Sequence, residues 1–159
     1  MEATENYLQV LSDSLDRKIV ILEEIQRLTD SQRNIASGES FDDKAFENTI
    51  EKKSALIEQI TKLDSGFRLL YDNIKEQLEN SRSLYKNEIA KLQQKIKIIL
   101  DKNAALQTAE QSNRNLIAKR FGELKKEIYR IKKSRDTAAN YYKTMNNITS
   151  EPFFLDQKK

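Results

Sequence analysis

The stretch FENTIEKKSALIEQITKLDSGFRLLYDNIKEQL, residues 46–78, has apolar side chains at every third or fourth position and contains no proline. This spacing places them along one side of an α-helix. An unbroken helix from Phe46 to Met145 would extend for about 150 Å, far beyond a compact domain of this size. The helix must therefore fold back or pack against another chain. The apolar seam comprises Phe46, Ile50, Ile57, Ile60, Phe67, Ile74, Leu78, Tyr85, Leu92, Ile96, Ile99, Leu106, Ile117, Leu124, Ile128, Ile131, Ala138, Tyr142 and Met145.

A first helix is predicted upstream, from about Thr4 to Ser37, because the same spacing occurs at Leu8, Leu11, Leu15, Leu22 and Ile25. The loop SGESFDD, residues 37–43, separates it from the second helix. We expect Gly38 to adopt a left-handed conformation after the first helix and Ser40 to cap the second. A loop this short predicts that the two helices are antiparallel neighbours.

The later turns have weaker signals. The segment ENSRS, residues 79–83, interrupts the seam with small polar residues, and residues 101–115 place Asn103, Glu110 and Asn113 at seam positions. We favour a turn at 79–83, followed by a third helix that runs to about residue 146 and bends near 103–113. The prediction is an all-α fold: an elongated antiparallel bundle of about three long helices with coiled-coil-like packing over residues 1–149, followed by a flexible aromatic tail, 150–159.

Composition restricts the chemistry of this chain of 159 residues. It is 38% apolar and 33% charged, and it contains no cysteine, histidine or tryptophan. The thiol nucleophile, the usual zinc ligands and the commonest general base are therefore missing. We expect no catalytic residues, metal or cofactor. The acidic start and the lack of a long apolar run predict a cytoplasmic protein without a membrane span.

Charge divides unevenly along the chain, with a net charge of −7 over residues 1–80 and +10 over residues 81–159. Complementary charges along helix flanks favour antiparallel pairing of the two halves. The most basic segment, 114–135, raises the hypothesis of nucleic-acid binding. Because the apolar seam continues through it and no recognition motif accompanies it, we interpret its basic residues as solvated flanks of a helix.

Two regions are candidate partner-binding sites. Gly66 interrupts a strong helical pattern, which indicates close packing, a mild kink or a notch beside Phe67 for a partner's side chain. At the other end, the pattern fades after two adjacent tyrosines, and three large apolar residues follow Pro152. These residues either cover the end of the bundle or form a docking peptide. The candidates here are Tyr141, Tyr142, Phe153, Phe154 and Leu155.

Three segments resemble the FlgN-type flagellar export chaperones, particularly those of clostridial relatives. They are LSDSLDRKIVILEEI (11–25), KSALIEQITKLDSGFRLLY (53–71) and YYKTMNNITSEPFFLDQKK (141–159). The resemblance implies a small cytoplasmic helical protein that keeps hook-filament junction subunits soluble, through their C-terminal helical segments, and delivers them to the type III export gate. It also implies that an aromatic residue near the C-terminus contacts the gate.

Other functions remain open at this point. One is a structural coiled coil that dimerises or scaffolds a larger assembly, which the length of the seam favours. Another is a chaperone for the filament cap protein. The sequence is compatible with a monomer or a homodimer.

Overall fold

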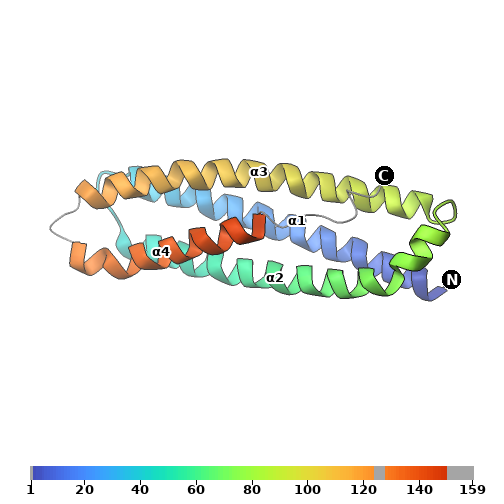
Figure 1. Cartoon of the computed structure of the whole chain (residues 1–159). Coiled ribbons are helices and arrows are strands. Elements are labelled where there is room, and N and C mark those ends of the chain that lie inside the picture. Colours follow the sequence, from blue (N-terminus) through green and yellow to red (C-terminus); the bar gives the residue numbers. More distant parts are fainter. Residues whose placement is uncertain (1, 124–127, 150–159) are drawn as a thin grey trace.

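The computed structural model describes residues 2–123 and 128–149, which form four α-helices (Figure 1). They are α1 (Glu2–Ser37), α2 (Asp43–Asn80), α3 (Lys86–Glu123) and α4 (Ile128–Thr149). No strand occurs in this described part of the chain. The prediction of an all-α bundle is confirmed.

Helix α1 lies between α2 and α3 and packs along both, whereas α2 and α3 make little contact with each other. Helix α4 occupies the remaining side, against α2 and, less extensively, α3 (Figure 1). Helices that follow one another in the chain run in opposite directions. At 1.5 Å per residue, α1, α2 and α3 are each about 55 Å long and α4 is about 33 Å. The bundle is therefore elongated, and α4 covers only part of its length.

The turn predicted at residues 79–83 is confirmed, because α2 ends at Asn80 and α3 begins at Lys86. The prediction of one long third helix to about residue 146 is wrong. Helix α3 ends at Glu123, and α4 begins at Ile128. The break returns the later part of the seam to the bundle, where its apolar and aromatic side chains are buried; these are Ala138, Tyr141, Tyr142 and Met145.

The loop between α1 and α2 differs from the prediction in two details. No glycine among the described residues has a positive φ, so Gly38 is not left-handed. The cap of α2 is Asp42 rather than Ser40, and its carboxylate accepts a hydrogen bond of 3.0 Å from the backbone N–H of Ala45. Asp42 directly precedes the first helical residue, which is the position from which a side chain reaches the free N–H groups of a helix.

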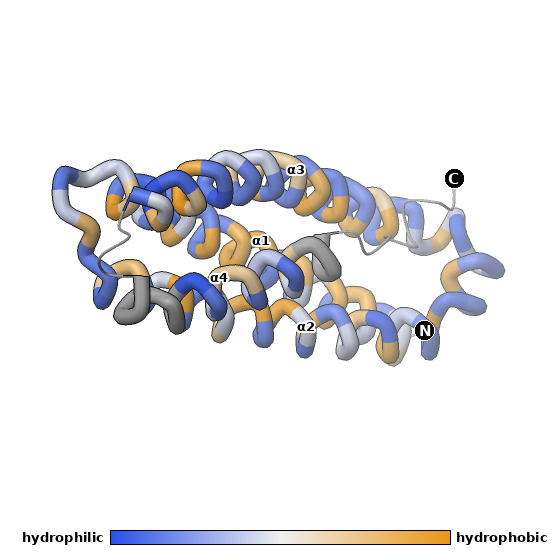
Figure 2. The backbone as a smooth tube through the Cα atoms, turned by 60° about the vertical axis from the view of Figure 1, so that its left-hand side comes forward, coloured by the Kyte–Doolittle hydropathy of each residue, from blue (hydrophilic) through white to orange (hydrophobic). Residues whose placement is uncertain are grey.

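The core is a continuous seam of apolar side chains along the inner faces of the helices. Figure 2 shows hydrophobic and hydrophilic positions alternating along each helix, as the amphipathic pattern requires. An aromatic cluster lies at the end of the bundle where the α1–α2 loop meets α3. The ring centroids of Phe41 and Phe46 are 5.3 Å apart, and each contacts Phe121 edge to face, at 5.7 and 5.9 Å. These contacts tie the loop to the helices beneath it.

The acidic half of the chain lies beside the basic half at the contact between α1 and α3. Lys95 of α3 pairs with Asp16 of α1 at 2.9 Å, and Lys102 pairs with Glu23 at 3.1 Å. Such exposed pairs each contribute at most about 1 kcal/mol to stability. They nevertheless favour this pairing of helices over others, so the predicted placement of the acidic half beside the basic half is confirmed for α1 and α3.

Gly66 has no close neighbour. It lies inside α2, and no atom stands within 4 Å of the position that a Cβ would occupy. The expectation of close packing at this glycine is therefore wrong. We expect Gly66→Ala to raise the free energy of unfolding by about 0.5–1 kcal/mol, because alanine loses less backbone entropy in a helix. Urea denaturation followed by circular dichroism would measure this.

The control for this substitution is Gly38→Ala. There a Cβ would lie 3.4 Å from the carbonyl oxygen of Ser40, in a loop rather than a helix. No comparable gain is expected. A loss of stability in Gly66→Ala would contradict the open environment of Gly66.

Candidate functional site

Polar side chains from all four helices are buried together at the level of Tyr141 in α4. Each helix contributes at least one of them, and all are less than 9% exposed. We call this group the buried polar cluster: Thr29 and Gln32 of α1, Lys53 of α2, Glu110 and Asn113 of α3, and Tyr141 of α4.

Lys53 is the centre of the buried polar cluster and has no exposed surface. Its ammonium group forms an ion pair with Glu110 and donates a hydrogen bond of 2.7 Å to Oε1 of Gln32. Nζ also lies 4.1 Å from the centroid of the Tyr141 ring, within the range of a cation–π contact. A single lysine of α2 therefore contacts side chains from the three other helices.

Glu110 accepts further hydrogen bonds from two hydroxyl groups. Thr29 donates to its Oε1 at 2.6 Å, and Tyr141 donates to the same oxygen at 3.0 Å. Asn113, one turn further along α3, donates to the backbone carbonyl of Thr29 at 2.7 Å. Together with the contacts of Lys53, these bonds join all four helices, so they specify how α4 aligns with the others.

Burial shifts the pKa values in the cluster. Desolvation lowers the pKa of Lys53 to about 8, although the carboxylate of Glu110 opposes this shift. Burial, reinforced by Glu110, raises the pKa of the Tyr141 hydroxyl well above its ordinary value. A lysine with a lowered pKa is a potential nucleophile. No substrate can reach Nζ of Lys53 in this arrangement, however, so the geometry supports a role in aligning the helices.

The buried polar cluster was not predicted from the sequence, although a signal for it exists. Lys53 lies on the apolar seam, between Ile50 and Ile57. Asn103, Glu110 and Asn113 also lie on the seam and are only 5%, 4% and 2% exposed. The predicted bend near these three residues stays a prediction, and no turn occurs there, because α3 is continuous through them. A lysine and a glutamate at seam positions of different helices are the pattern that indicates a buried pair.

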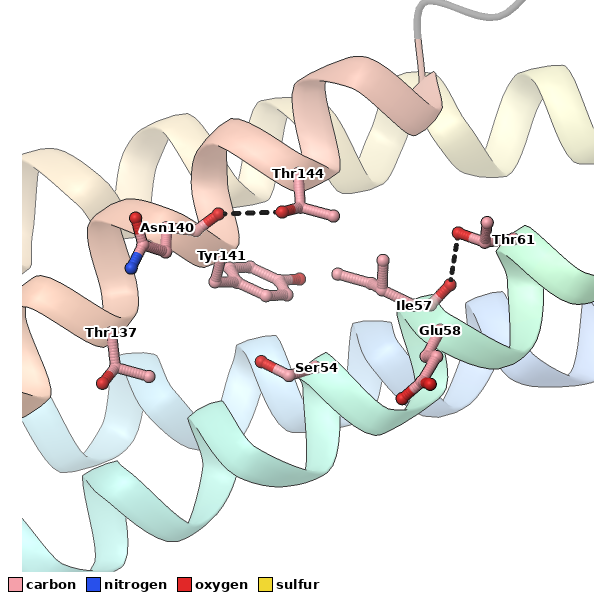
Figure 3. Close-up of a pocket in the computed structure, with 8 residues that line it drawn as sticks. All are labelled: Ser54, Ile57, Glu58, Thr61, Thr137, Asn140, Tyr141 and Thr144. Carbon is pink, nitrogen blue, oxygen red and sulfur yellow. Dashed lines mark hydrogen bonds between the residues drawn. The ribbon is translucent and has the colours of Figure 1, made fainter.

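A pocket of about 360 Å³ opens beside the cluster, between α2 and α4. Figure 3 shows the Tyr141 ring pointing from α4 toward Ile57 of α2. The hydroxyls of Thr61 and Thr144 donate to carbonyls of their own helices, so their methyl groups are left to line the pocket. The walls are Ser54, Ile57, Glu58, Thr61, Thr137, Asn140, Tyr141 and Thr144.

The structure places the predicted site residues in different environments. Tyr141 and Tyr142 are 3% and 7% exposed, with their rings packed edge to face, so both belong to the interior of the bundle. Phe67 is 8% exposed and stacks on Tyr71, and the adjacent Gly66 faces open space. The two tyrosines are neighbours on α4, whereas Phe67 lies on α2 and belongs to a different aromatic pair. Phe153, Phe154 and Leu155 lie outside the described residues.

In the part of the chain that the structure describes, no helix has both the length and the apolar content of a membrane span. No group of carboxylates in the same part is arranged to hold a metal ion. No protein-family model matches the chain, and comparison with curated proteins and with solved structures found no match.

Proposed function

We propose that this protein is a cytoplasmic flagellar export chaperone of the FlgN type, which binds hook-filament junction subunits through helix–helix contacts and delivers them to the export gate. The three-segment resemblance gives the family. The bundle supplies a physical reason for the binding. A subunit whose terminal segment becomes an amphipathic helix on assembly needs a helical partner beforehand, and such contacts require no chemistry.

The observation that carries the proposal is the distribution of exposed apolar side chains over the bundle. Thr144 and Thr61 line the same pocket, so α4 ends near residue 66 of α2, about 7 Å further along. Lys18 of α1 pairs with Asp64 of α2, and Lys95 of α3 pairs with Asp16 of α1, so residue 66 of α2 is level with about residue 16 of α1 and about residue 95 of α3. Residues 2–16 and 67–95 therefore lie beyond the end of α4, and we call them the uncovered half. Of the large apolar side chains that are exposed in the described residues, Val10, Leu69 and Leu84 belong to the uncovered half, and Val20, Ile98 and Leu100 lie within about 8 Å of its border.

This distribution supports a helical client. Helix α4 packs on α2 and α3 over one half of the bundle, and a client helix would pack on the uncovered half. Scattered apolar residues are normal on a protein surface, but those of the described residues lie in or next to the half that lacks a fourth helix. Gate contact is assigned by the resemblance to Phe153 and Phe154, since Tyr141 and Tyr142 are buried.

The test is binding of the purified protein to the C-terminal helical segment of a hook-filament junction subunit, measured by calorimetry. We expect saturable binding with a dissociation constant on the order of 1 µM. The double substitution Leu69→Glu/Leu100→Glu should weaken it at least about tenfold, because it places two carboxylates in the apolar contact.

The matched control is Ala55→Glu/Gln107→Glu, which changes the same two helices and the same net charge in the half that α4 covers. Ala55 and Gln107 are both exposed, and the control should bind within about twofold of the unchanged protein. Absence of saturable binding to junction subunits would contradict the proposal. Preferential binding of a filament cap segment would assign the protein to that client instead.

Light scattering coupled to size exclusion separates the chaperone from a scaffold. A chaperone should form a one-to-one complex with its client. A stable elongated homodimer that does not dissociate on addition of the client would favour the scaffold.

A further inference from the structure

A second, smaller hollow lies on the other flank of α4, between α4 and α3. Its volume is about 160 Å³, and its walls are mainly apolar. Ile117, Ala118 and Phe121 of α3 face Ala138, Ala139 and Tyr142 of α4 across it. Ligand sites for cofactors and drug-sized molecules typically measure about 300–1,000 Å³. This α3–α4 hollow therefore has room for a single apolar side chain.

Two arginines line the same hollow, one from each helix. They are Arg114 of α3 and Arg135 of α4, and both are exposed. Arg114 lies 5.9 Å from the centroid of the Tyr142 ring, a cation–π distance. Within the described chain, neither guanidinium pairs with a carboxylate, although Lys95, Lys102 and other cations of the bundle do. Among the described residues, the rim of the hollow thus carries two positive charges that no carboxylate pairs with.

Tyr142 provides a third feature of the hollow. Its side chain is among the buried ones, at 7% exposed, and its hydroxyl has no hydrogen-bond partner among the described residues. Because this hydroxyl is buried, a bound segment would contact the ring of Tyr142 and not its hydroxyl.

We propose that the α3–α4 hollow binds an acidic, hydrophobic segment of a partner protein. A leucine-sized side chain fills the apolar floor, and carboxylates beside it pair with Arg114 and Arg135. Arginine suits this role because its planar group binds carboxylates through two parallel hydrogen bonds. The site lies outside the uncovered half, and it does not depend on the export function proposed above.

The experiment uses fluorescence anisotropy of a labelled synthetic peptide in which leucine alternates with glutamate, titrated with the full chain. We expect a dissociation constant on the order of 100 µM at low salt, since one side chain is buried. Replacing the glutamates of the peptide by glutamine should abolish measurable binding. Arg114→Glu/Arg135→Glu should weaken binding by at least about tenfold.

The charge control is Lys91→Glu/Lys97→Glu, which makes the same change in net charge at two exposed lysines near the other end of α3. It should leave the affinity within about twofold. Ala118→Phe tests the apolar floor, because a phenyl group at this exposed position would occupy the hollow without altering charge. Thermal melting would verify that each variant is folded.

Equal losses in the two charge-reversal variants would show non-specific attraction and overturn the proposal. Unchanged binding by a folded Ala118→Phe protein would also overturn it. A chain that ends at Ser150 tests another occupant, because the segment EPFFLD, residues 151–156, has the same acidic and hydrophobic chemistry. If the peptide binds only this shortened chain, the natural occupant is the protein's own C-terminal segment, and the assignment to a partner protein is wrong.

Discussion

Replacing Lys53 by methionine is expected to lower the free energy of unfolding by about 3–5 kcal/mol. Methionine has nearly the same length but has no amino group, so the buried carboxylate of Glu110 loses a hydrogen-bond donor as well as its cation, whereas a deprotonated Lys53 would still donate to it. Oε1 of Gln32 would also lose the hydrogen bond that it accepts from Lys53. Urea denaturation at pH 7 would measure the change. Lys52→Met is the control, because Lys52 is exposed, and it should alter stability by less than about 0.5 kcal/mol.

Adding Glu110→Gln to Lys53→Met should recover most of this loss. The amide oxygen still accepts hydrogen bonds from Thr29 and Tyr141, and no buried charge remains. Replacing both partners of a buried ion pair is often neutral or stabilising. A double variant as unstable as Lys53→Met alone would contradict the assignment of Lys53 and Glu110 as a buried ion pair. So would a Lys53→Met protein as stable as Lys52→Met.

The pH dependence of stability is expected to be unusual. Lys53 has a folded pKa of about 8, whereas a lysine in an unfolded chain has a pKa near 10.4. Between these values the unfolded state binds more protons, so the free energy of unfolding rises with pH. Lys53 alone contributes about 2 kcal/mol to the rise from pH 8 to pH 10, and the two buried tyrosines, Tyr141 and Tyr142, reduce the net rise. Glu110 of α3 and Tyr141 of α4 are the titratable groups that face Lys53, and α1 contributes only neutral ones.

Above pH 10 the trend should reverse. The pKa values of Tyr141 and Tyr142 are raised, chiefly by burial, so both hydroxyls keep their protons in the folded state after unfolded tyrosines have ionised. The folded state then binds more protons, and stability falls as pH increases. Urea titrations from pH 7 to pH 11 should show a maximum near pH 10.

The control for the pH experiment is the double variant Lys53→Met/Glu110→Gln. It should lose the rise between pH 8 and 10 and keep the decline above pH 10, because only the tyrosines remain. If the double variant retains the rise, another group titrates in that range, and Lys53 is not its origin.

Much of the fold was predictable because it depends on local pattern. The apolar spacing gave the helices, and the run of small polar residues at 79–83 gave the turn between α2 and α3. The break between α3 and α4 was not predicted. The seam spacing of Leu124, Ile128 and Ile131 continues across it, so the local pattern resembles an uninterrupted helix. Only the burial of Tyr141, Tyr142 and Met145 against the other helices requires the chain to turn there.

The site was less predictable than the fold. Tyr141 was identified as a candidate for contact with a partner because aromatic residues near a terminus often act as anchors. Its hydroxyl instead bonds Glu110 in the interior. Polar residues on the seam were interpreted as a bend, because a single helix contains no information about what faces it. Their partners are distant in sequence, with Lys53 separated from Glu110 by 57 residues.

The sequence by itself determined that this chain forms long amphipathic helices with a narrow apolar seam, and that an acidic helix lies beside a basic one. These properties follow from residue spacing and charge, which act over one or two helical turns. Only the tertiary structure decided that Lys53 and Glu110 meet, that α4 covers one half of the bundle, and that apolar surface remains on the other half. Each of these depends on how separate helices align, because a buried charge is tolerated only where the fold supplies its partner.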